Sequence, residues 1–397
     1  MGDTISFSRE TYNDNAPIIV YGASVYGELA YVALKQMGIH LDYYCDQSQK
    51  RKEYFGVEVI TPEKLDDFKN ANIIIASADF FREIKIMLVE KGFEYLFDMR
   101  ALLELKLPKE KLSNRALEMY DNKQYYFDIV HNQSKEKLVF NRIQYVVTER
   151  CSLRCRDCSH LIQYYQHPKD IDLDRYKESF DLLLKHVDRI AELRILGGEP
   201  FMNGNMEKLI DWYYDCNKIQ GISVYTNGTI IPNEKVLKKL KKDKVKVHIS
   251  DYKINKPGIK RLANVFDEYH IVYFVRNYDA WQEAGGVECR NRTLEEKKAL
   301  FAGCFERNGY TFLKGQLHRC PRSAHAMNLK AMPDIKEEYV DLLNWCGTEE
   351  ELKEKLRKLQ ERSWLESCNY CGGPDNHAQG IPAAIQISAP IAYDAKY

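Results

Sequence analysis

The chain has 397 residues, of which 45% are hydrophobic and 29% charged. That composition is typical of a soluble globular protein, and the length predicts two or three domains instead of one core. Lys plus Arg and Asp plus Glu are balanced at 58 each, which excludes a strong electrostatic attraction to nucleic acid or to an anionic membrane.

The N-terminal sequence, the lengths of the apolar runs and the distribution of cysteines predict the cellular location of the protein. The N-terminal sequence MGDTISFSRE has no apolar core, so we expect no signal peptide. The longest apolar runs, such as NIIIASA from Asn72, have the length of a buried strand and are too short to span a bilayer. The 11 cysteines are clustered and unevenly spaced, which favours metal binding in a reducing cytosol over a secreted disulfide framework. We therefore expect a cytoplasmic protein with no membrane or nucleic-acid partner.

Residues 1–110 alternate between strand and helix patterns. PIIVYGASVYGELAYVALKQMG reads as a strand, a glycine turn and a helix, and IHLDYYCDQS reads as a second strand that ends at Asp46. ANIIIASA reads as a later strand. This alternation predicts a Rossmann-like parallel sheet.

The glycine turn of this segment is a candidate nucleotide site. Gly22 and Gly27 bound the turn, which lacks the middle glycine of the dinucleotide fingerprint, and Asp46 stands about 20 residues further on, where a ribose-binding acid would stand. The segment resembles the small nucleotide-sugar-binding domain at the front of certain sugar acetyltransferases. The alternative is a module without a ligand that serves only for docking.

The rest of the chain divides into a helical linker with a loop at 111–140, a β/α region at 141–300, a cysteine-containing region at 301–375 and a tail at 376–397. Short strands are predicted in the β/α region at residues 143–148, ELRILGG, ISVYTNG, VKVHIS and HIVYFVR, with helical patterns between them. This organisation predicts a partial or complete parallel barrel, whose chemistry lies at the carboxyl ends of the strands. A hairpin is predicted around Lys314-Gly315 and a charged helix at about 348–362.

Three cysteines, Cys151, Cys155 and Cys158, follow the first of these strands in the sequence CSLRCRDCSH. A zinc site would use four ligands, or three and an open position, and an iron–sulfur cluster can also be held by three thiolates. The C-x3-C-x2-C loop resembles that of the radical S-adenosylmethionine (SAM) superfamily. The segment Gly197-Gly198-Glu199-Pro200, about 40 residues later at a strand end, resembles the GGEP segment of the same superfamily.

The resemblance implies a fold, cofactors and roles for particular residues. The three cysteines would hold three irons of a [4Fe–4S] cluster, SAM would occupy the fourth, and an electron would split SAM into a 5′-deoxyadenosyl radical that abstracts hydrogen. The two glycines would let the backbone approach SAM and Glu199 would orient its ammonium group. Asn227 in YTNG and Ser250 in HISDY are candidates to contact the ribose or carboxylate of SAM. The superfamily usually has an aromatic residue where Asp157 stands here, and His160 could supply that packing.

Four further cysteines, Cys304, Cys320, Cys368 and Cys371, resemble the ligands of the Twitch form of the auxiliary-cluster domain. They would hold a second [4Fe–4S] cluster completely, and the alternative is a structural zinc ribbon, which a C-x2-C pair also permits. The remaining thiols are read as ordinary ones: Cys45, Cys216, Cys289 and Cys346.

Two function classes follow from this reading. The first is a radical SAM enzyme that oxidises or epimerises a sugar or nucleotide-linked sugar, with an electron donor such as flavodoxin or ferredoxin. Asp251 and Arg276 are candidates for a base and for a phosphate or carboxylate clamp at the barrel mouth. The second is modification of a peptide or protein side chain, against which the βαβ pattern of the front segment argues. A scaffold without activity is a third class, disfavoured by the two sets of cluster ligands.

Overall fold

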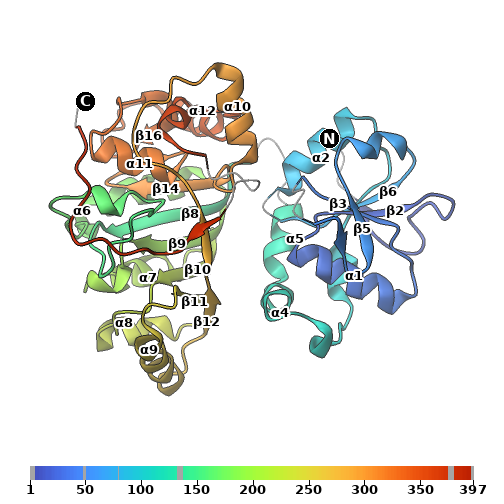
Figure 1. Cartoon of the computed structure of the whole chain (residues 1–397), viewed down its shortest axis with the longest axis horizontal. Helices are drawn as coiled ribbons and strands as arrows, with labels where there is room; N and C mark the ends of the chain where they lie inside the picture. Colours follow the sequence, from blue (N-terminus) through green and yellow to red (C-terminus); the bar gives the residue numbers. More distant parts are fainter. Residues whose placement is uncertain (1–4, 48–50, 79, 132–136, 374–379, 395–397) are drawn as a thin grey trace. The chain divides into compact units, whose positions relative to one another are not determined.

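The computed structural model describes residues 5–47, 51–78, 80–131, 137–373 and 380–394. The chain divides into two compact units, Met1–Lys137 and Leu138–Tyr397 (Figure 1). Each unit has its own sheet and its own hydrophobic core.

The first unit is a seven-stranded sheet in the order β1-β7-β6-β2-β3-β5-β4. Strand β2 lies in the middle, and the chain adds β3 and β5 on one side of it and β6 and β7 on the other, all in parallel; only β4 is antiparallel to its neighbour. The strands predicted near residues 18, 46 and 72 are confirmed. The bounds of the strands are β1 Ile5–Ser6, β2 Ile18–Tyr21, β3 Tyr43–Cys45, β4 Glu53–Tyr54, β5 Val57–Ile60, β6 Asn72–Ile75 and β7 Leu96–Asp98.

Two helices lie in the segment that was predicted to be a helical linker, and both belong to the first unit. The helices of this unit are α1 Val25–Met37, α2 Phe81–Glu90, α3 Arg100–Glu104, α4 Asn114–Asp121 and α5 Gln124–His131. In α5, the fully buried Tyr126 donates its hydroxyl hydrogen to the carbonyl of Ile75 (2.6 Å) and accepts from the amide of Met99 (3.1 Å). Ser113 caps α4 and binds the buried carboxylate of Glu28 on α1. Helices α4 and α5 have only eight residues each, so the sequence pattern alone did not indicate that the two helices pack on the first unit.

A fragment of residues 1–137 is therefore expected to fold, and one of residues 1–110 is expected to be strongly destabilised. The shorter fragment exposes the sites of Tyr126, Ile129 and Val130, which are at most 5% exposed, and each such side chain contributes about 1.5–3 kcal/mol. Their sum is a large part of the roughly 5–15 kcal/mol of a typical domain. Urea unfolding of both fragments, followed by circular dichroism, measures the difference; equal midpoints would contradict this assignment of α4 and α5.

The second unit is an eight-stranded sheet in the order β12-β11-β10-β9-β8-β14-β15-β16. Strands β8 to β12 are parallel, and β14 also runs parallel to β8, while β15 and β16 are antiparallel. This is the predicted partial barrel. Its strands are β8 Val139–Thr148, β9 Arg189–Gly197, β10 Ile219–Thr226, β11 Val245–Asp251, β12 Tyr273–Asn277, β14 Gly309–Leu313, β15 Gln316–His318 and β16 Tyr339–Asp341.

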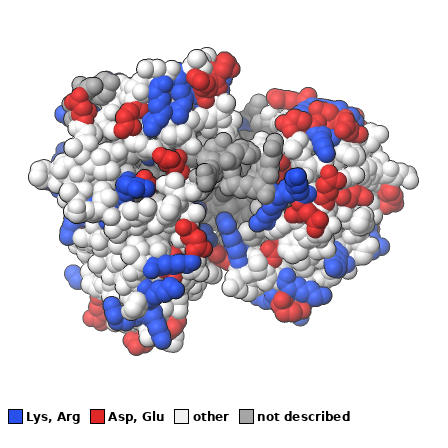
Figure 2. Space-filling view, viewed as in Figure 1, with Lys and Arg blue, Asp and Glu red and all other residues white. Residues whose placement is uncertain are grey.

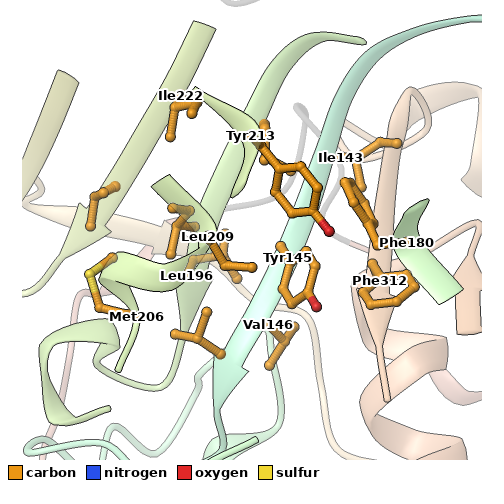
Figure 3. Packing of buried hydrophobic residues seen from close by; sticks show 14 of the residues in the cluster. Ile143, Tyr145, Val146, Phe180, Leu196, Met206, Leu209, Tyr213, Ile222 and Phe312 are labelled. Carbon is orange, nitrogen blue, oxygen red and sulfur yellow. The ribbon is translucent and has the colours of Figure 1, made fainter. Parts of the chain in front are cut away.

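Helices connect the parallel strands and cover one face of the sheet (Figure 1). These helices are α6 Leu173–His186, α7 Glu207–Tyr213, α8 Glu234–Leu240 and α9 Lys256–Glu268. Three further helices follow later in the chain: α10 Leu294–Gly303, α11 Pro321–Asn328 and α12 Glu349–Gln360. Figure 3 shows the core between helices and sheet, in which Tyr145 packs against Phe180 and Phe312, with Tyr213 behind. Residues of the opposite parity along β8 to β12 point to the other face of the sheet.

The region 301–375 is continuous with the barrel sheet. The predicted hairpin is formed by β14 and β15, and β14 pairs with β8 through Tyr310 opposite Ile143. The predicted charged helix is α12, whose first turn is closed by a capping box of Thr348 and Glu351. Because the auxiliary region extends the same sheet, it belongs to the second unit and does not separate from it.

The C-terminal tail, for which the sequence indicated no structure, has defined contacts in residues 380–394. Strand β17 (Gly380–Pro382) pairs with β13 (Ala280–Gln282), and the red segment that follows runs across the second unit (Figure 1). No helix among the described residues combines the length and the apolar character needed to cross a membrane. Figure 2 shows acidic and basic side chains on the visible face of each unit, in keeping with the balanced composition.

Candidate active site

The three-cysteine loop begins directly after β8. Thr148, the last residue of the strand, accepts the amide of Arg150 (3.0 Å) and binds Asp170 (2.7 Å), which also pairs with the Arg150 guanidinium. These bonds fix the exit of the chain from the sheet. The loop then turns at Cys155, whose carbonyl accepts the amide of Cys158 at 3.3 Å.

The GGEP segment packs directly against this loop. The amide of Gly198 donates to Thr148 (2.9 Å) and that of Glu199 to Arg150 (2.8 Å). A Cβ atom on Gly198 would lie 2.1 Å from the Arg150 oxygen and 2.9 Å from the Cβ of Cys151, and one on Gly197 would lie 2.3 Å from the Thr148 oxygen. Side chains at these two positions would clash with the cysteine loop, so glycine is needed for the loop to pack here. The sequence pattern alone did not indicate this role.

Glu199 is fully buried and its carboxylate is occupied by protein donors. It accepts from the hydroxyl of Thr226 (2.7 Å), the amide of Asn227 (2.8 Å) and the amide of Phe201 (3.2 Å). Burial raises the pKa of Glu199 to about 7, against the lowering effect of these bonds. The carboxylate joins the ends of β9 and β10. Pro200 begins a short 3₁₀ turn, Pro200–Met202, behind it.

Two carboxamides donate to sulfur atoms of the loop. Asn227 Nδ2 lies 3.5 Å from Cys151 Sγ, and Gln386 Nε2, from the C-terminal tail, lies 3.2 Å from Cys155 Sγ. Asn227 was predicted on the strand-end pattern, whereas Gln386 was missed, because 231 residues separate it from its partner. Burial raises the pKa of the Cys151 thiol to about 12 and that of Cys155 to about 11, and also raises that of Cys158. Metal binding at these thiols must therefore release protons.

Tyrosine and tryptophan side chains lie beside the loop, where the sequence has Asp157 in place of an aromatic residue. Asp157 pairs with Arg156 (3.0 Å). Tyr252 is in contact with Tyr278 and Trp281, with ring centroids 5.7 and 5.3 Å apart. Burial, with the charges of Cys158 and Cys155 nearby, raises the pKa of Tyr252, while its hydrogen bond with Ser250 opposes the shift. Ser250 is thus engaged with Tyr252.

His160 points away from this aromatic group. Its Nε2 lies 3.2 Å from Gln144 Oε1, and its ring packs edge-on against His325, with centroids 5.7 Å apart. His325 in turn bonds the hydroxyl of Tyr165 at 2.8 Å. His160 therefore belongs to a polar group between β8 and α11.

The face of the barrel sheet opposite the helices is lined by charged and aromatic residues. The strand registers pair residues across this face as follows: Arg142 with Glu192, Gln144 with Arg194, Arg194 with Ser223, Tyr225 with His248, His248 with Phe274, and Ser250 with Arg276. Arg194 pairs with Glu192 (2.7 Å) and lies over the Tyr225 ring, which stacks on His248 at 4.6 Å. Arg142 pairs with Glu306 (2.9 Å).

Neighbouring groups set the protonation states of the titratable side chains on this face. Burial alone would raise the pKa of Glu192, but Arg194 and the hydroxyl of Ser223 lower it to about 2. Burial and the charge of Arg276 lower the pKa of His248 to about 3, so this imidazole is neutral near pH 7. Three guanidinium groups, on Arg142, Arg194 and Arg276, face two carboxylates, on Glu192 and Glu306, which leaves an excess of positive charge among these five.

Asp251 lies at the carboxyl end of β11 and contacts the backbone of the following turn. It has the parity of the core residues Val247 and Ile249 on β11, and its carboxylate accepts the amide of Lys253 at 2.7 Å. It is 9% exposed. Asp251 therefore caps the turn after β11, whereas Arg276 lies on the barrel face with Ser250.

The four later cysteines line one cavity. The walls of the cavity include Cys304, Cys320, Cys368 and Cys371, together with apolar side chains such as Leu161, Phe301 and Leu365. Arg292 holds the C-x2-C turn by donating to the carbonyls of Cys368 and Cys371, both at 2.5 Å. Leu161 follows the first cysteine loop directly, with its amide bonded to the Cys158 carbonyl (3.1 Å). Leu161 thus connects the first cysteine loop to the wall of the cavity that holds the second set.

Both sets fit iron–sulfur clusters in the chemistry of their donors. The first offers three thiols beside a glycine-lined strand end, and the second offers four around an apolar cavity. Within the described ranges, no three His, Cys, Asp or Glu side chains converge closely enough to hold a single metal ion. Each thiolate of a cluster binds its own iron, so a cluster needs its cysteines further apart than one ion does.

The predicted nucleotide residues of the first unit have structural contacts. The Asp46 carboxylate accepts the amide of Ala23 at 2.8 Å. A Cβ on Gly22 would lie 2.5 Å from the Ala76 oxygen, and one on Gly27 would lie 2.1 Å from the Gly22 oxygen. The glycines serve the close packing of β2, α1 and β6, and the Asp46 carboxylate stabilises the turn after β2.

Residues 145–283 match the family model of the Radical SAM superfamily. This segment contains the cysteine loop, the GGEP segment and strands β9 to β12. Residues 145–283 are therefore a radical SAM domain, as the motifs predicted, and that superfamily implies a [4Fe–4S] cluster and SAM as cofactors.

Curated relatives are similar over part of the chain. The GTP 3',8-cyclase of Aliarcobacter butzleri is 32% identical over 119 residues, which cover 30% of this chain and 36% of that protein. The antilisterial bacteriocin subtilosin biosynthesis protein AlbA of Bacillus subtilis is 28% identical over 145 residues, which cover 36% of this chain and 31% of that protein. The chain thus spans about a third of the length of these relatives.

Solved structures with some likeness include native anSMEcpe with bound AdoMet and BtrN in complex with AdoMet and 2-DOIA. The first is 16% identical, with a TM-score of 0.36, over 55% of this chain and 82% of that one. The second is 13% identical, with a TM-score of 0.33, over 62% of this chain and 100% of that one.

Proposed function

We propose that this protein is a radical SAM enzyme that removes hydrogen from an anionic, hydroxyl-bearing small molecule, a sugar or nucleotide-linked sugar. The observation that carries the proposal is the seating of the three-cysteine loop on Gly197 and Gly198 at the carboxyl end of β8. That seating brings the three thiols to the mouth of a partial barrel with a polar inner face, where a radical formed from SAM would meet a substrate.

Cys151, Cys155 and Cys158 would hold the cluster that splits SAM, and the later four cysteines would hold a second cluster able to accept an electron. The protein's own contribution is binding and orientation. Arg276 would bind a phosphate or carboxylate of the substrate, since a guanidinium suits such groups. Tyr252 and Trp281 would cover the loop and exclude water. The second cysteine set supports oxidation over epimerisation, since oxidation needs an acceptor for a second electron.

The substrate class rests on the charge of the barrel face. Arg142 and Arg194 are paired with Glu306 and Glu192, so Arg276 is the guanidinium on this face that we assign to an anion. The stacked rings of Tyr225 and His248 favour a planar or sugar-like group. A relative whose name specifies GTP supports a nucleotide-bearing substrate. Similarity to AlbA, named for the biosynthesis of a bacteriocin, favours a peptide as the second candidate. The front unit would bind the nucleotide only at a surface other than the closed Asp46 turn.

The experiment is incubation of the reconstituted full chain with SAM, a reductant and a panel of UDP-, CDP-, GDP- and ADP-linked sugars. We expect 5′-deoxyadenosine and a sugar product lighter by the mass of H₂, both detected by mass spectrometry. Calorimetry of the full chain with the same panel separates binding from turnover. Turnover of a peptide library with no turnover of any sugar would establish the second candidate instead.

Replacing Arg276 by Gln is expected to raise the KM for the accepted sugar by roughly 10- to 100-fold, because a charged hydrogen bond contributes about 1.5–3 kcal/mol. SAM cleavage without substrate should not change. Arg276→Lys should recover part of the loss, since it keeps the charge. The exposed Arg175 on α6 offers a matched control, and Arg175→Gln should leave the KM unchanged. An unchanged KM in Arg276→Gln would remove Arg276 from the substrate site.

A further inference from the structure

The C-terminal tail forms an antiparallel pairing with the first cysteine loop. The amide of Arg156 donates to the Ile385 carbonyl (2.8 Å), and the amide of Ile387 donates to the Arg154 carbonyl (2.9 Å). Cys155 and Gln386 are directly opposite each other in this pairing. The tail thus binds the loop on both sides of its central cysteine.

Further contacts anchor the tail before and after this point. Upstream, β17 pairs with β13. Downstream, the Arg154 guanidinium donates to the Ser388 carbonyl (2.7 Å), and the amide of Ile391 donates to Gln163 (2.8 Å). The Tyr393 hydroxyl donates to Leu329 at 2.7 Å. With anchors on both sides, the position of residue 386 over the loop is set by the fold and not by one side chain.

The carboxamide of Gln386 is held in a single orientation by three contacts. Its Oε1 accepts the amide of Arg154 (2.8 Å), and its Nε2 donates to the Ala384 carbonyl (2.7 Å) and to Cys155 Sγ (3.2 Å). The bond from Arg154 identifies the oxygen and so leaves the nitrogen facing the sulfur. Cys155 is 9% exposed, so this N–H meets a largely desolvated thiol, where a hydrogen bond to a charged sulfur is stronger than in water.

We propose that Gln386 is a positioning residue for the radical SAM cluster: it holds the Cys155 ligand through an N–H to sulfur bond and raises the reduction potential of that cluster. The proposal rests on the proposed function, since it assigns a cluster to the three cysteines. Reduction adds negative charge to a cluster, and donors to its sulfurs stabilise the reduced form more than the oxidised form. The tail therefore sets how readily the cluster accepts the electron that begins the reaction.

Gln386→Glu is the variant that tests this role. It keeps the length of the side chain and the acceptor for Arg154, and it replaces the donor by an oxygen that repels the thiolate. Redox titration of the reconstituted full chain, monitored by the electron paramagnetic resonance of the cluster, is expected to give a more negative midpoint potential than wild type. Ser388→Ala is the matched control, because only the carbonyl of Ser388 contacts the loop, and it should leave the potential unchanged.

A second measurement needs no metal. Hydrogen exchange of the metal-free full chain should show protected amides at Arg156 and Ile387, and a chain ending at residue 379 should lose the protection at Arg156. An unchanged potential in Gln386→Glu, at normal iron content, would overturn the role of Gln386. Unprotected amides would overturn the pairing itself. If the three cysteines bind no cluster while the amides are protected, the proposed function fails and the tail remains a structural strap.

Discussion

Replacing Cys151, Cys155 and Cys158 together by alanine is expected to abolish cleavage of SAM, with no 5′-deoxyadenosine above background. The loop lies at the end of β8 on Gly198 and supplies the only protein ligands that we assign to this cluster. Without these thiolates the iron has no site, and SAM cleavage then lacks the cluster that would supply its electron. Chromatography of reaction mixtures with SAM and dithionite measures the loss.

The loss should be specific to the loop. The same variant should keep the iron of the second cysteine set, because Arg292 and the walls of that cavity are unchanged. Cys216, Cys289 and Cys346 belong to neither set, and their triple alanine variant is the matched control with full SAM cleavage. Retained 5′-deoxyadenosine production in the loop variant would refute the role given to the loop.

The intact chain is expected to contain about eight iron and eight sulfide per molecule after anaerobic reconstitution, four of each per cluster. Replacing Cys368 and Cys371 by alanine should reduce both by about half. These thiols are buried with Cys304 and Cys320 in one largely apolar cavity, where thiolates without a metal are unfavourable; burial raises the pKa of Cys304 to about 11. Colorimetric iron and sulfide assays give the counts.

Two other outcomes would change the assignment. Zinc in place of half of the iron in the intact chain would convert the second site into a structural zinc site. The double variant should still produce 5′-deoxyadenosine from SAM, because the first loop is intact, but it should no longer oxidise substrate. If it oxidised substrate at the wild-type rate, the four-cysteine cavity would have no part in the reaction.

Local sequence patterns predicted most strands of both sheets. They predicted the packing of short helices less well, for a physical reason. In β8 to β12, apolar residues recur at every second position up to a polar strand end, so strand, turn and face can be read together. In α4 and α5, the buried residues are few and include tyrosines such as Tyr126, whose hydroxyl is satisfied only by Ile75 and Met99. An exposed helix and a helix packed against a sheet can have the same pattern, so the pattern does not show whether the helix is buried.

The roles of single residues were harder to predict than the site itself. Gly198, Glu199 and Asp46 stand where cofactor-binding residues would stand, yet each has a partner within the protein. Spacing along a chain indicates which residues reach a strand end. It does not indicate whether a carboxylate there meets an amide of the next strand or a ligand, because both use the same acceptor geometry.

The sequence by itself determined the motifs on which the proposed chemistry depends: three closely spaced thiols after a strand, a GGEP segment at the next strand end, and four later cysteines. Spacing over a few residues is enough for that, because a short loop can hold its own ligands. The tertiary structure decided which distant groups act on those thiols. Gln386 lies 231 residues from Cys155 along the chain, and Arg276 shares a barrel face with Arg142 only because the strands between them are in register. Such contacts arise from chain folding over long separations, which no local pattern records.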